Sequence, residues 1–122
     1  MKIFISGPMS GKPEYNFPEF NKRESILRNQ GWEVVNPVTI CELYGGAEKV
    51  TNDKHLFDLM IDKEITELKK CDAIYMLKGW EDSCGAFKEY FVARRLHLYC
   101  MYEENGFFKR IIRNLRNWAY EC

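Results

Sequence analysis

The sequence contains no CxxC pair, and its five cysteines are odd in number and scattered along the chain. This pattern argues against a disulfide framework and against a structural zinc site. No apolar run approaches the ~20 residues that a helix needs to span a bilayer, and no signal peptide precedes the first predicted strand. We therefore expect a cytoplasmic protein that is not bound to a membrane and holds no metal.

An excess of either charge is also missing, because 18 Lys and Arg residues balance 18 Asp and Glu residues. A chain without a broad basic footprint is not expected to bind nucleic acid. Neither a Walker A loop nor a GxGxxG motif occurs, so ATP and NAD sites have little support and no cofactor is expected. What the chain does have is 122 residues, 46% of them hydrophobic, which is enough for a single packed domain over residues 1–122.

Short apolar runs alternate with segments of helical periodicity along the chain. Such alternation predicts right-handed βαβ crossovers and a doubly wound parallel α/β sheet of about four to five strands with flanking helices. Residues 38–52 are ambiguous, with a break at Gly45-Gly46. The expected strands are 2–6, 32–35, 72–77 and 97–102, and the expected helices are 18–30, 53–70, 83–96 and an amphipathic C-terminal helix at 107–120.

Two loops carry most of the residues that suggest chemistry. The loop GPMSGKP (7–13) follows the first predicted strand, and KGWEDSCG (78–85) follows the third. In parallel α/β sheets, ligands bind beyond the carboxyl ends of the strands, at a topological switch point. The sequence therefore predicts that both loops meet at one site.

The first loop offers glycines and a serine where a strand passes into a helix. Exposed backbone N–H groups in such a loop can bind phosphate or sugar oxygens. The alternative is a simple connection in which glycine supplies a positive φ angle. The residues expected to bind substrate in this segment are Ser6, Gly7, Pro8, Met9, Ser10 and Gly11.

In the second loop, Ser83 stands at the predicted N-cap of the helix that begins in SCGAFKEY. Its hydroxyl can cap the helix, and the partial positive charge of the helix N-terminus can also hold an anion against Ser83 and the amide of Gly85. Glu89 follows Gly85 by four residues, and its side chain leans back toward the helix N-terminus. A carboxylate would then stand beside the phosphate site; the simpler interpretation is a solvent-exposed glutamate.

Cys84 and Trp80, in the same loop, allow further interpretations. A helix N-terminus favours the thiolate form of cysteine, but a catalytic cysteine also needs a base. The only histidines are His55 and His97, and His97 is expected at the opposite edge of the sheet. Trp80 can stack on a base and is counted among the substrate-binding residues, or it can fold over the core of its own domain.

Four segments together resemble the nucleoside 2-deoxyribosyltransferase-like superfamily and, within it, the DUF4406 proteins that are often found in phages and bacteria. They are KIFISGPMSG, EYNFPEFN, WEVVNP and CDAIYMLKGWEDSCGAFKEY. The resemblance runs from residue 1 to about 102. Its most informative part is the glycine followed four residues later by glutamate, after a CDA-type strand. It implies a flavodoxin-like fold, in agreement with the predicted alternation of strands and helices.

Members of this superfamily cleave the N-glycosidic bond of nucleosides or nucleotides through a glutamate on this helix. The resemblance thus implies that Glu89 attacks C1′ of the sugar and forms a covalent glycosyl-enzyme, which water or another base resolves. Nucleoside transferases of the superfamily tend to carry an acid six residues before this glutamate, and the monophosphate hydrolases carry a serine. Ser83 occupies that position and favours a nucleoside 5′-monophosphate as the ligand.

Two positions depart from the superfamily pattern. A tyrosine is common in the first strand, where this chain has Phe4. An aspartate is common in the helix before the third strand, where this chain has Glu64. The resemblance implies that Glu64, or Asp62 nearby, acts as the acid toward the leaving base.

Two functions from different classes follow. The first is a nucleotide N-glycosidase or deoxyribosyltransferase-like enzyme with Glu89 as its nucleophile. The alternative is a non-catalytic nucleotide-binding or phage accessory protein that retains the pocket.

Relatives usually assemble as homodimers or larger, so the resemblance also implies a homo-oligomer. The base, the sugar and the choice between hydrolysis and transfer are left open.

Overall fold

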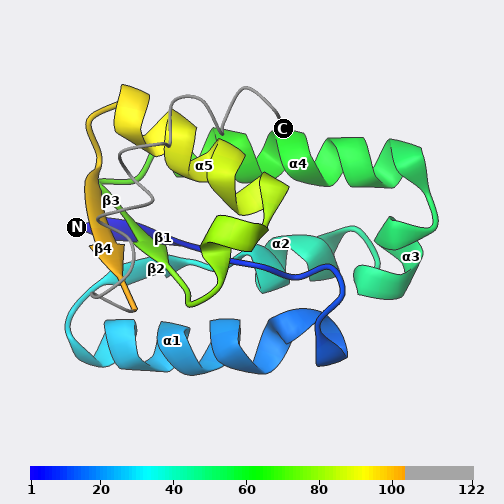
Figure 1. The fold of residues 1–122 in the computed structure, drawn as a ribbon, viewed down its shortest axis with the longest axis horizontal. Helices are drawn as coiled ribbons and strands as arrows, with labels where there is room; N and C mark the ends of the chain where they lie inside the picture. Colours follow the sequence, from blue (N-terminus) through cyan, green and yellow to red (C-terminus); the bar gives the residue numbers. More distant parts are fainter. Residues whose placement is uncertain (104–122) are drawn as a thin grey trace.

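The computed structural model describes residues 1–103 of the chain (Figure 1). In this part, four parallel strands form one sheet in the spatial order β2-β1-β3-β4. A parallel sheet flanked by helices confirms the predicted flavodoxin-like α/β class. The strands are β1 (Lys2–Ser6), β2 (Glu33–Val35), β3 (Ala73–Met76) and β4 (Tyr99–Tyr102).

The helices predicted at 18–30, 53–70 and 83–96 are all present, and each end differs from the prediction by at most two residues. The helix predicted at 107–120 lies outside the described residues. No helix in the described part of the chain is long and apolar enough to cross a membrane. The helices are α1 (Phe17–Asn29), α2 (Pro37–Leu43), α3 (Ala47–Thr51), α4 (Lys54–Leu68) and α5 (Cys84–Arg95), with short 3-10 helices η1 (Pro13–Asn16) and η2 (Trp80–Asp82).

The stretch between β2 and α4, ambiguous in the sequence, forms the two short helices α2 and α3. Asn36 caps α2, because its Oδ1 accepts a hydrogen bond from the N–H of Val38 at 2.9 Å, and Pro37 takes the first helical position. Gly45 and Gly46 separate the two helices with φ angles of 106° and 94°, which glycine adopts without strain. The Asn-Pro pair therefore ends β2 and starts the next helix.

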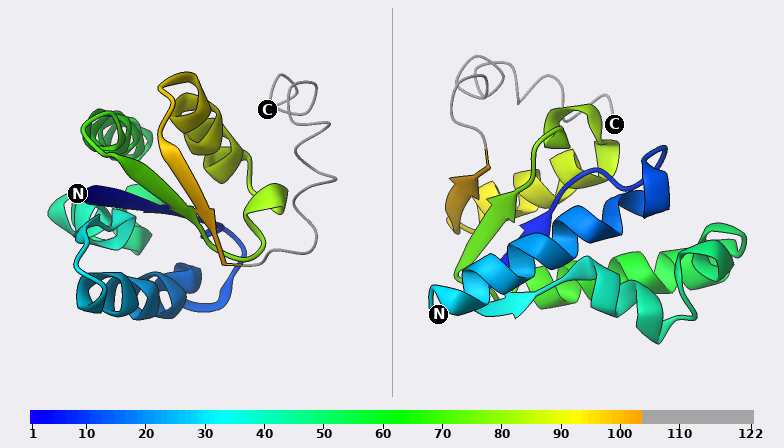
Figure 2. Two further views of the ribbon diagram at one scale, coloured as in Figure 1. Left: turned by 90° about the vertical axis from the view of Figure 1, so that its left-hand side faces the viewer. Right: turned by 90° about the horizontal axis from the view of Figure 1, so that it is seen from below.

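Helices cover both faces of the sheet (Figure 2). On one face, Phe20 of α1 packs with Ile3 and Ile5. On the other face, Phe87 of α5 packs with Phe4. Successive side chains of a strand point to opposite faces, so a strand covered on both sides is apolar throughout. For this reason β3 is buried at every position.

The carboxyl ends of β1 and β3 lie side by side. Ser6 pairs with Met76 in the parallel register, and the N–H of Leu77 donates a hydrogen bond to the carbonyl oxygen of Ser6 at 2.8 Å. Gly7 then passes so close to Leu77 that a Cβ on this glycine would lie 2.8 Å from Leu77 Cβ. Only glycine fits such an approach, and the two loops consequently leave the same edge of the sheet together.

Candidate active site

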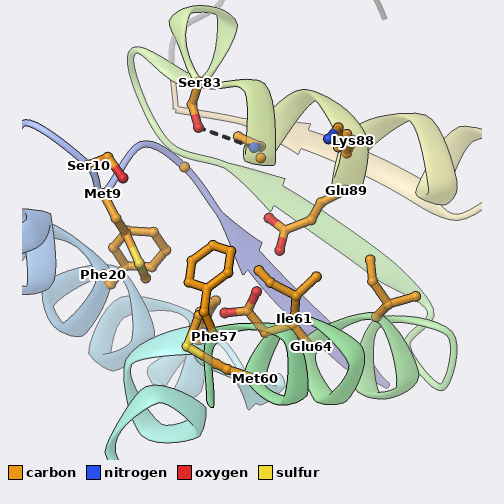
Figure 3. Close-up of a pocket in the computed structure, with 15 residues that line it drawn as sticks. Met9, Ser10, Phe20, Phe57, Met60, Ile61, Glu64, Ser83, Lys88 and Glu89 are labelled. Atoms are coloured by element: carbon orange, nitrogen blue, oxygen red, sulfur yellow. Dashed lines mark hydrogen bonds between the residues drawn. The ribbon is translucent and has the colours of Figure 1, made fainter. Parts of the chain in front are cut away.

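A cavity of about 430 Å³ lies at the carboxyl edge of the sheet, between the loop after β1 and the helices α4 and α5 (Figure 3). This volume is typical of small-molecule sites. Both loops singled out in the sequence contribute to the cavity. Gly7, Met9 and Ser10 line it from the first loop, and Ser83 and Gly85 line it from the second.

The N-terminus of α5 opens onto this cavity. Ser83 is the N-cap residue, and its hydroxyl oxygen accepts a hydrogen bond from the N–H of Ala86 at 3.2 Å. Gly85, in the first turn, is exposed, and the nearest atom to a Cβ placed on it would be Ser83 Oγ, 4.0 Å away. The first turn of α5 therefore presents an uncovered glycine backbone and the partial positive charge of the helix to a ligand.

Glu89 enters the cavity from the second turn of α5 and is held in place by β1. Ser6, the last residue of β1, is fully buried, and its hydroxyl donates a hydrogen bond to Glu89 Oε1 at 2.5 Å. Ser6 is predicted from the sequence to bind substrate, but in the structure its hydroxyl is directed to Glu89. This bond between the sheet and α5 orients the carboxylate of Glu89.

Glu64 reaches the same point from α4. It is 4% exposed, and it lies on the buried stripe of α4 that Met60 and Leu68 continue at intervals of four residues. Figure 3 shows its carboxyl group facing that of Glu89, and the two groups influence each other's pKa. Charged residues are rare on the buried stripe of a helix, so the position of Glu64 between Met60 and Leu68 already indicates a functional role in the sequence.

The carboxyl pair binds protons more tightly than free glutamate does. Burial is the main cause of the raised pKa of Glu64, and the charge of Glu89 and the hydrogen bond to it add to the increase. Burial also raises the pKa of Glu89, although hydrogen bonds from Ser6 and Glu64 favour its charged form and reduce the increase. Both carboxyl groups therefore hold a proton to higher pH than free glutamate does, and the increase in pKa is larger for Glu64.

Outside the first loop, two predicted site residues, Asp62 and Trp80, do not line the cavity. Asp62 is exposed and does not line it, so Glu64 is the acid that α4 brings to the site. Trp80 is 3% exposed and packs on Phe87 and Tyr90, with ring centroids 5.0 and 4.7 Å apart. Trp80 thus belongs to the core beneath α5, and this placement favours the core interpretation over base stacking.

Three positions near the first loop support the fold rather than the cavity. Pro8 is buried, and its carbonyl oxygen accepts a hydrogen bond from Asn16 Nδ2 at 2.9 Å. Gly11 is exposed and has a φ angle of 79°, a turn conformation that suits glycine. Phe4, which stands where the resembled superfamily commonly has tyrosine, is fully buried in the core. None of these three residues lines the cavity.

Most of the apolar lining of the cavity is not predicted from the sequence. α4 contributes Phe57, Ile61 and Ile65, which recur every four residues, a pattern that is typical of a core-facing helix. Phe57 is 45% exposed and is therefore not a core residue. The spacing of apolar residues along α4 does not show this exposure. The lining residues missed in the sequence are Phe20, Pro37, Phe57, Met60, Ile61, Ile65, Ala86 and Lys88.

The two histidines contribute nothing to the lining of the cavity. His97 lies in the turn before β4, at the opposite edge of the sheet, as predicted. Its φ angle of 59° makes β4 start two residues later than the sequence predicts. A cysteine–histidine mechanism at Cys84 therefore has no support in this arrangement. Within residues 1–103, no group of three or more His, Cys, Asp or Glu side chains is placed to hold a metal ion.

The chain belongs to the DUF4406 family, whose description is "Domain of unknown function (DUF4406)" and whose profile matches residues 1–102. This range contains all four strands and every residue that lines the cavity. No curated protein and no solved structure matches the chain.

Proposed function

We propose that this DUF4406 protein is a nucleotide N-glycosidase related to the nucleoside 2-deoxyribosyltransferase-like superfamily. It cleaves a (deoxy)nucleoside 5′-monophosphate through a covalent glycosyl-enzyme on Glu89. The observation that carries the proposal is the carboxyl pair: Glu89, oriented by Ser6, faces Glu64 in one cavity beside the N-terminus of α5, and the raised pKa of Glu64 favours its protonated form. A charged carboxylate next to a protonated one is the combination that displacement at an anomeric carbon requires.

The first turn of α5 is the proposed phosphate site. Helix N-termini bind phosphate through free backbone N–H groups and the helix dipole, and Gly85 leaves these groups accessible. Ser10 brings a hydroxyl group to the same cavity from the other loop. Lys88 lines the cavity one turn further along α5 and adds a positive charge on the side of the proposed phosphate site. These groups would select a 5′-phosphate over a free 5′-hydroxyl.

In the proposed first step, the Glu89 carboxylate attacks C1′ while the bond from C1′ to the base nitrogen breaks. The bonding electrons go to the base, which takes the proton of Glu64, and an ester bond joins the sugar to Glu89. In the second step, the ionised Glu64 accepts a proton from water as the water oxygen attacks C1′ and displaces Glu89. The products are the free base and the sugar 5-phosphate, and both carboxyl groups return to their starting states.

Release of free base from a panel of ribo- and deoxyribonucleoside 5′-monophosphates tests the proposal. We expect the protein to release the base from at least one monophosphate and to act far more slowly on the matching nucleoside, which lacks the phosphate. Chromatography separates the base from the nucleotide and identifies the substrate. Saturable nucleotide binding without any base release would contradict the glycosidase and favour the non-catalytic nucleotide-binding protein.

Gly85→Ala is expected to weaken binding of a 5′-monophosphate by about tenfold or more, with the fold intact. The added methyl group would have only Ser83 Oγ near it, at 4.0 Å, so the folded chain accommodates it. It would stand where a phosphate oxygen must approach the helix N-terminus. Calorimetric titration with a monophosphate and with its nucleoside measures the effect, and only the monophosphate should bind more weakly. Equal weakening of both ligands would contradict the phosphate site.

A further inference from the structure

The wall of the cavity that faces α5 is apolar. Phe57 and Ile61 of α4 lie two turns and one turn before Glu64, and the Phe57 ring points into the cavity beside the two carboxyl groups (Figure 3). Met9 and Phe20 extend this surface from the N-terminal segment. These four residues, Met9, Phe20, Phe57 and Ile61, are called the apolar wall below.

The polar side chains that line the cavity already have other partners or lie at the phosphate site. Ser83 caps α5, Glu89 accepts a hydrogen bond from Ser6, and Glu64 faces Glu89. Ser10 and Lys88 belong to the proposed phosphate site. Among the described residues, no Asn, Gln, Arg, His, Asp, Thr or Tyr side chain lines the cavity. The apolar wall therefore has no donor or acceptor side chain with which to read the edge of a base.

The chemistry of the proposed reaction places the base at this wall. Displacement at C1′ requires the attacking oxygen, C1′ and the leaving nitrogen to be aligned, so the base departs on the side away from Glu89. Glu89 extends from α5, and the surface facing it belongs to α4. Glu64, which gives its proton to the base, comes from α4 as well. Both requirements direct the base toward Phe57 and Ile61.

We propose that the nucleobase packs against Phe57 and Ile61, and that this subsite accepts purines and pyrimidines without reading their hydrogen-bonding edges. The inference rests on the proposed function and extends it to the class of base. Phe57 is 45% exposed, so a stacked base would cover its ring and remove apolar surface from water. Every nucleobase has an aromatic face that can make this contact.

Recognition of this kind is only weakly selective among bases. A site built to hydrogen-bond a polar group rejects a ligand that lacks it by about 10⁴-fold or more, whereas apolar contacts discriminate by roughly 10- to 200-fold. Selectivity then comes mainly from the sugar phosphate, which the N-terminus of α5 and the carboxyl pair recognise in every nucleotide.

Nucleotide binding to Glu89→Gln separates base recognition from base release, because this variant lacks the nucleophile. Calorimetry with the adenosine, guanosine, cytidine and uridine 5′-monophosphates should give dissociation constants within about tenfold of one another. The deoxyribonucleotides replace them if the base-release assay shows that the protein prefers deoxyribose. The sugar 5-phosphate, which has no base, should bind roughly tenfold more weakly or worse.

Phe57→Ala in the Glu89→Gln background tests the contact itself. It should weaken binding of all four nucleotides by roughly five- to twentyfold and leave binding of the sugar 5-phosphate unchanged. Phe57→Tyr keeps the aromatic ring and should bind like the parent. Leu59→Ala is the matched control, because Leu59 is 40% exposed on the same helix but does not line the cavity, and this change should alter no dissociation constant.

A preference of more than about 200-fold for one base would overturn the proposal. An equal effect of Phe57→Ala on the sugar 5-phosphate would overturn it as well, since the change would then act through structure. Base release by the wild-type protein is a separate measurement, independent of the binding experiments, and it tests the glycosidase. No release, together with the expected binding pattern, would contradict the glycosidase and leave the base subsite in a nucleotide-binding protein. Release from a single nucleotide only would support the glycosidase and overturn the subsite.

Discussion

Glu89→Gln is expected to abolish base release from the nucleoside 5′-monophosphate that the wild-type protein accepts, with kcat lowered by at least about 10³-fold. A neutral amide is a poor nucleophile toward C1′ and forms no ester that water can resolve, so both proposed steps are lost. Binding should persist, because the N-terminus of α5 and the apolar wall are unchanged. A base-release assay and calorimetry on the same preparation measure both quantities.

Glu81→Gln is the matched control for this prediction. Glu81 is half-buried in η2, close to the site in sequence, but it does not line the cavity. This variant should release base at the wild-type rate. Rapid quenching and mass spectrometry of the intact protein should show a sugar-phosphate adduct on the wild type and none on Glu89→Gln. Base release that survives in Glu89→Gln would remove this glutamate from the mechanism.

Glu64→Gln is expected to weaken the dependence of stability on pH and to slow base release by roughly 10²- to 10⁴-fold. In the folded protein the pKa of Glu64 and that of Glu89 are raised above the ordinary value of 4.5. Above that pH the folded protein therefore binds more protons than the unfolded chain, and the free energy of unfolding falls as the pH rises. The stabilisation from the pair is fully present below the unfolded pKa and is lost as the pH rises through the raised values.

In the Glu64→Gln protein, Glu89 is the one carboxylate left in the pair. The amide of the new side chain can donate a hydrogen bond to Glu89, so this group ionises more easily than beside another acid. The fall in stability should then shrink by up to about 1.4 kcal/mol for each pH unit. Urea unfolding of both proteins from about pH 5 to about pH 9 measures the slopes, and the variant is expected to be the more stable protein at the alkaline end.

Glu67→Gln is a control on the same helix, because the pKa of Glu67 is shifted in the opposite direction to that of Glu64. A hydrogen bond from Lys63 is the main cause that lowers the pKa of Glu67, so this group contributes stability above the unfolded pKa and loses it as the pH falls. Its replacement should not raise the stability at alkaline pH. If Glu64→Gln kept the pH slope of the wild type, the carboxyl pair would not hold a buried proton.

Local sequence patterns predicted most of the fold, because they depend on neighbours along the chain. The apolar run of β1 and the capping position of Ser83 are examples, and both elements begin where the sequence predicts. The predicted start of β4 is two residues too early because His97 adopts a left-handed φ angle. The sequence around His97 does not predict this conformation. The two short helices α2 and α3 were not predicted, because residues 38–52 are ambiguous in the sequence, although the Asn-Pro pair before them caps α2.

The candidate site was predictable where its residues share one helix or one loop. Ser83, Gly85 and Glu89 belong to α5, so their spacing alone places the cap, the exposed backbone and the carboxylate in order along the cavity. Spacing did not separate Glu64 from Asp62, which lie two residues apart on α4 and therefore point to different sides. It also did not show that Trp80 turns into the core.

By itself, the sequence determined the parallel α/β sheet, the edge at which both loops emerge and the order of groups along α5. Only the tertiary structure decided that Ser6 binds Glu89, that Glu64 meets Glu89, and that Phe57 lines the cavity instead of the core. Each of these contacts joins residues of different elements, and burial depends on how those elements pack. The raised pKa of Glu64 has the same origin, because burial in the folded protein and the neighbouring Glu89 of α5 cause it, and no segment of the chain alone contains that environment.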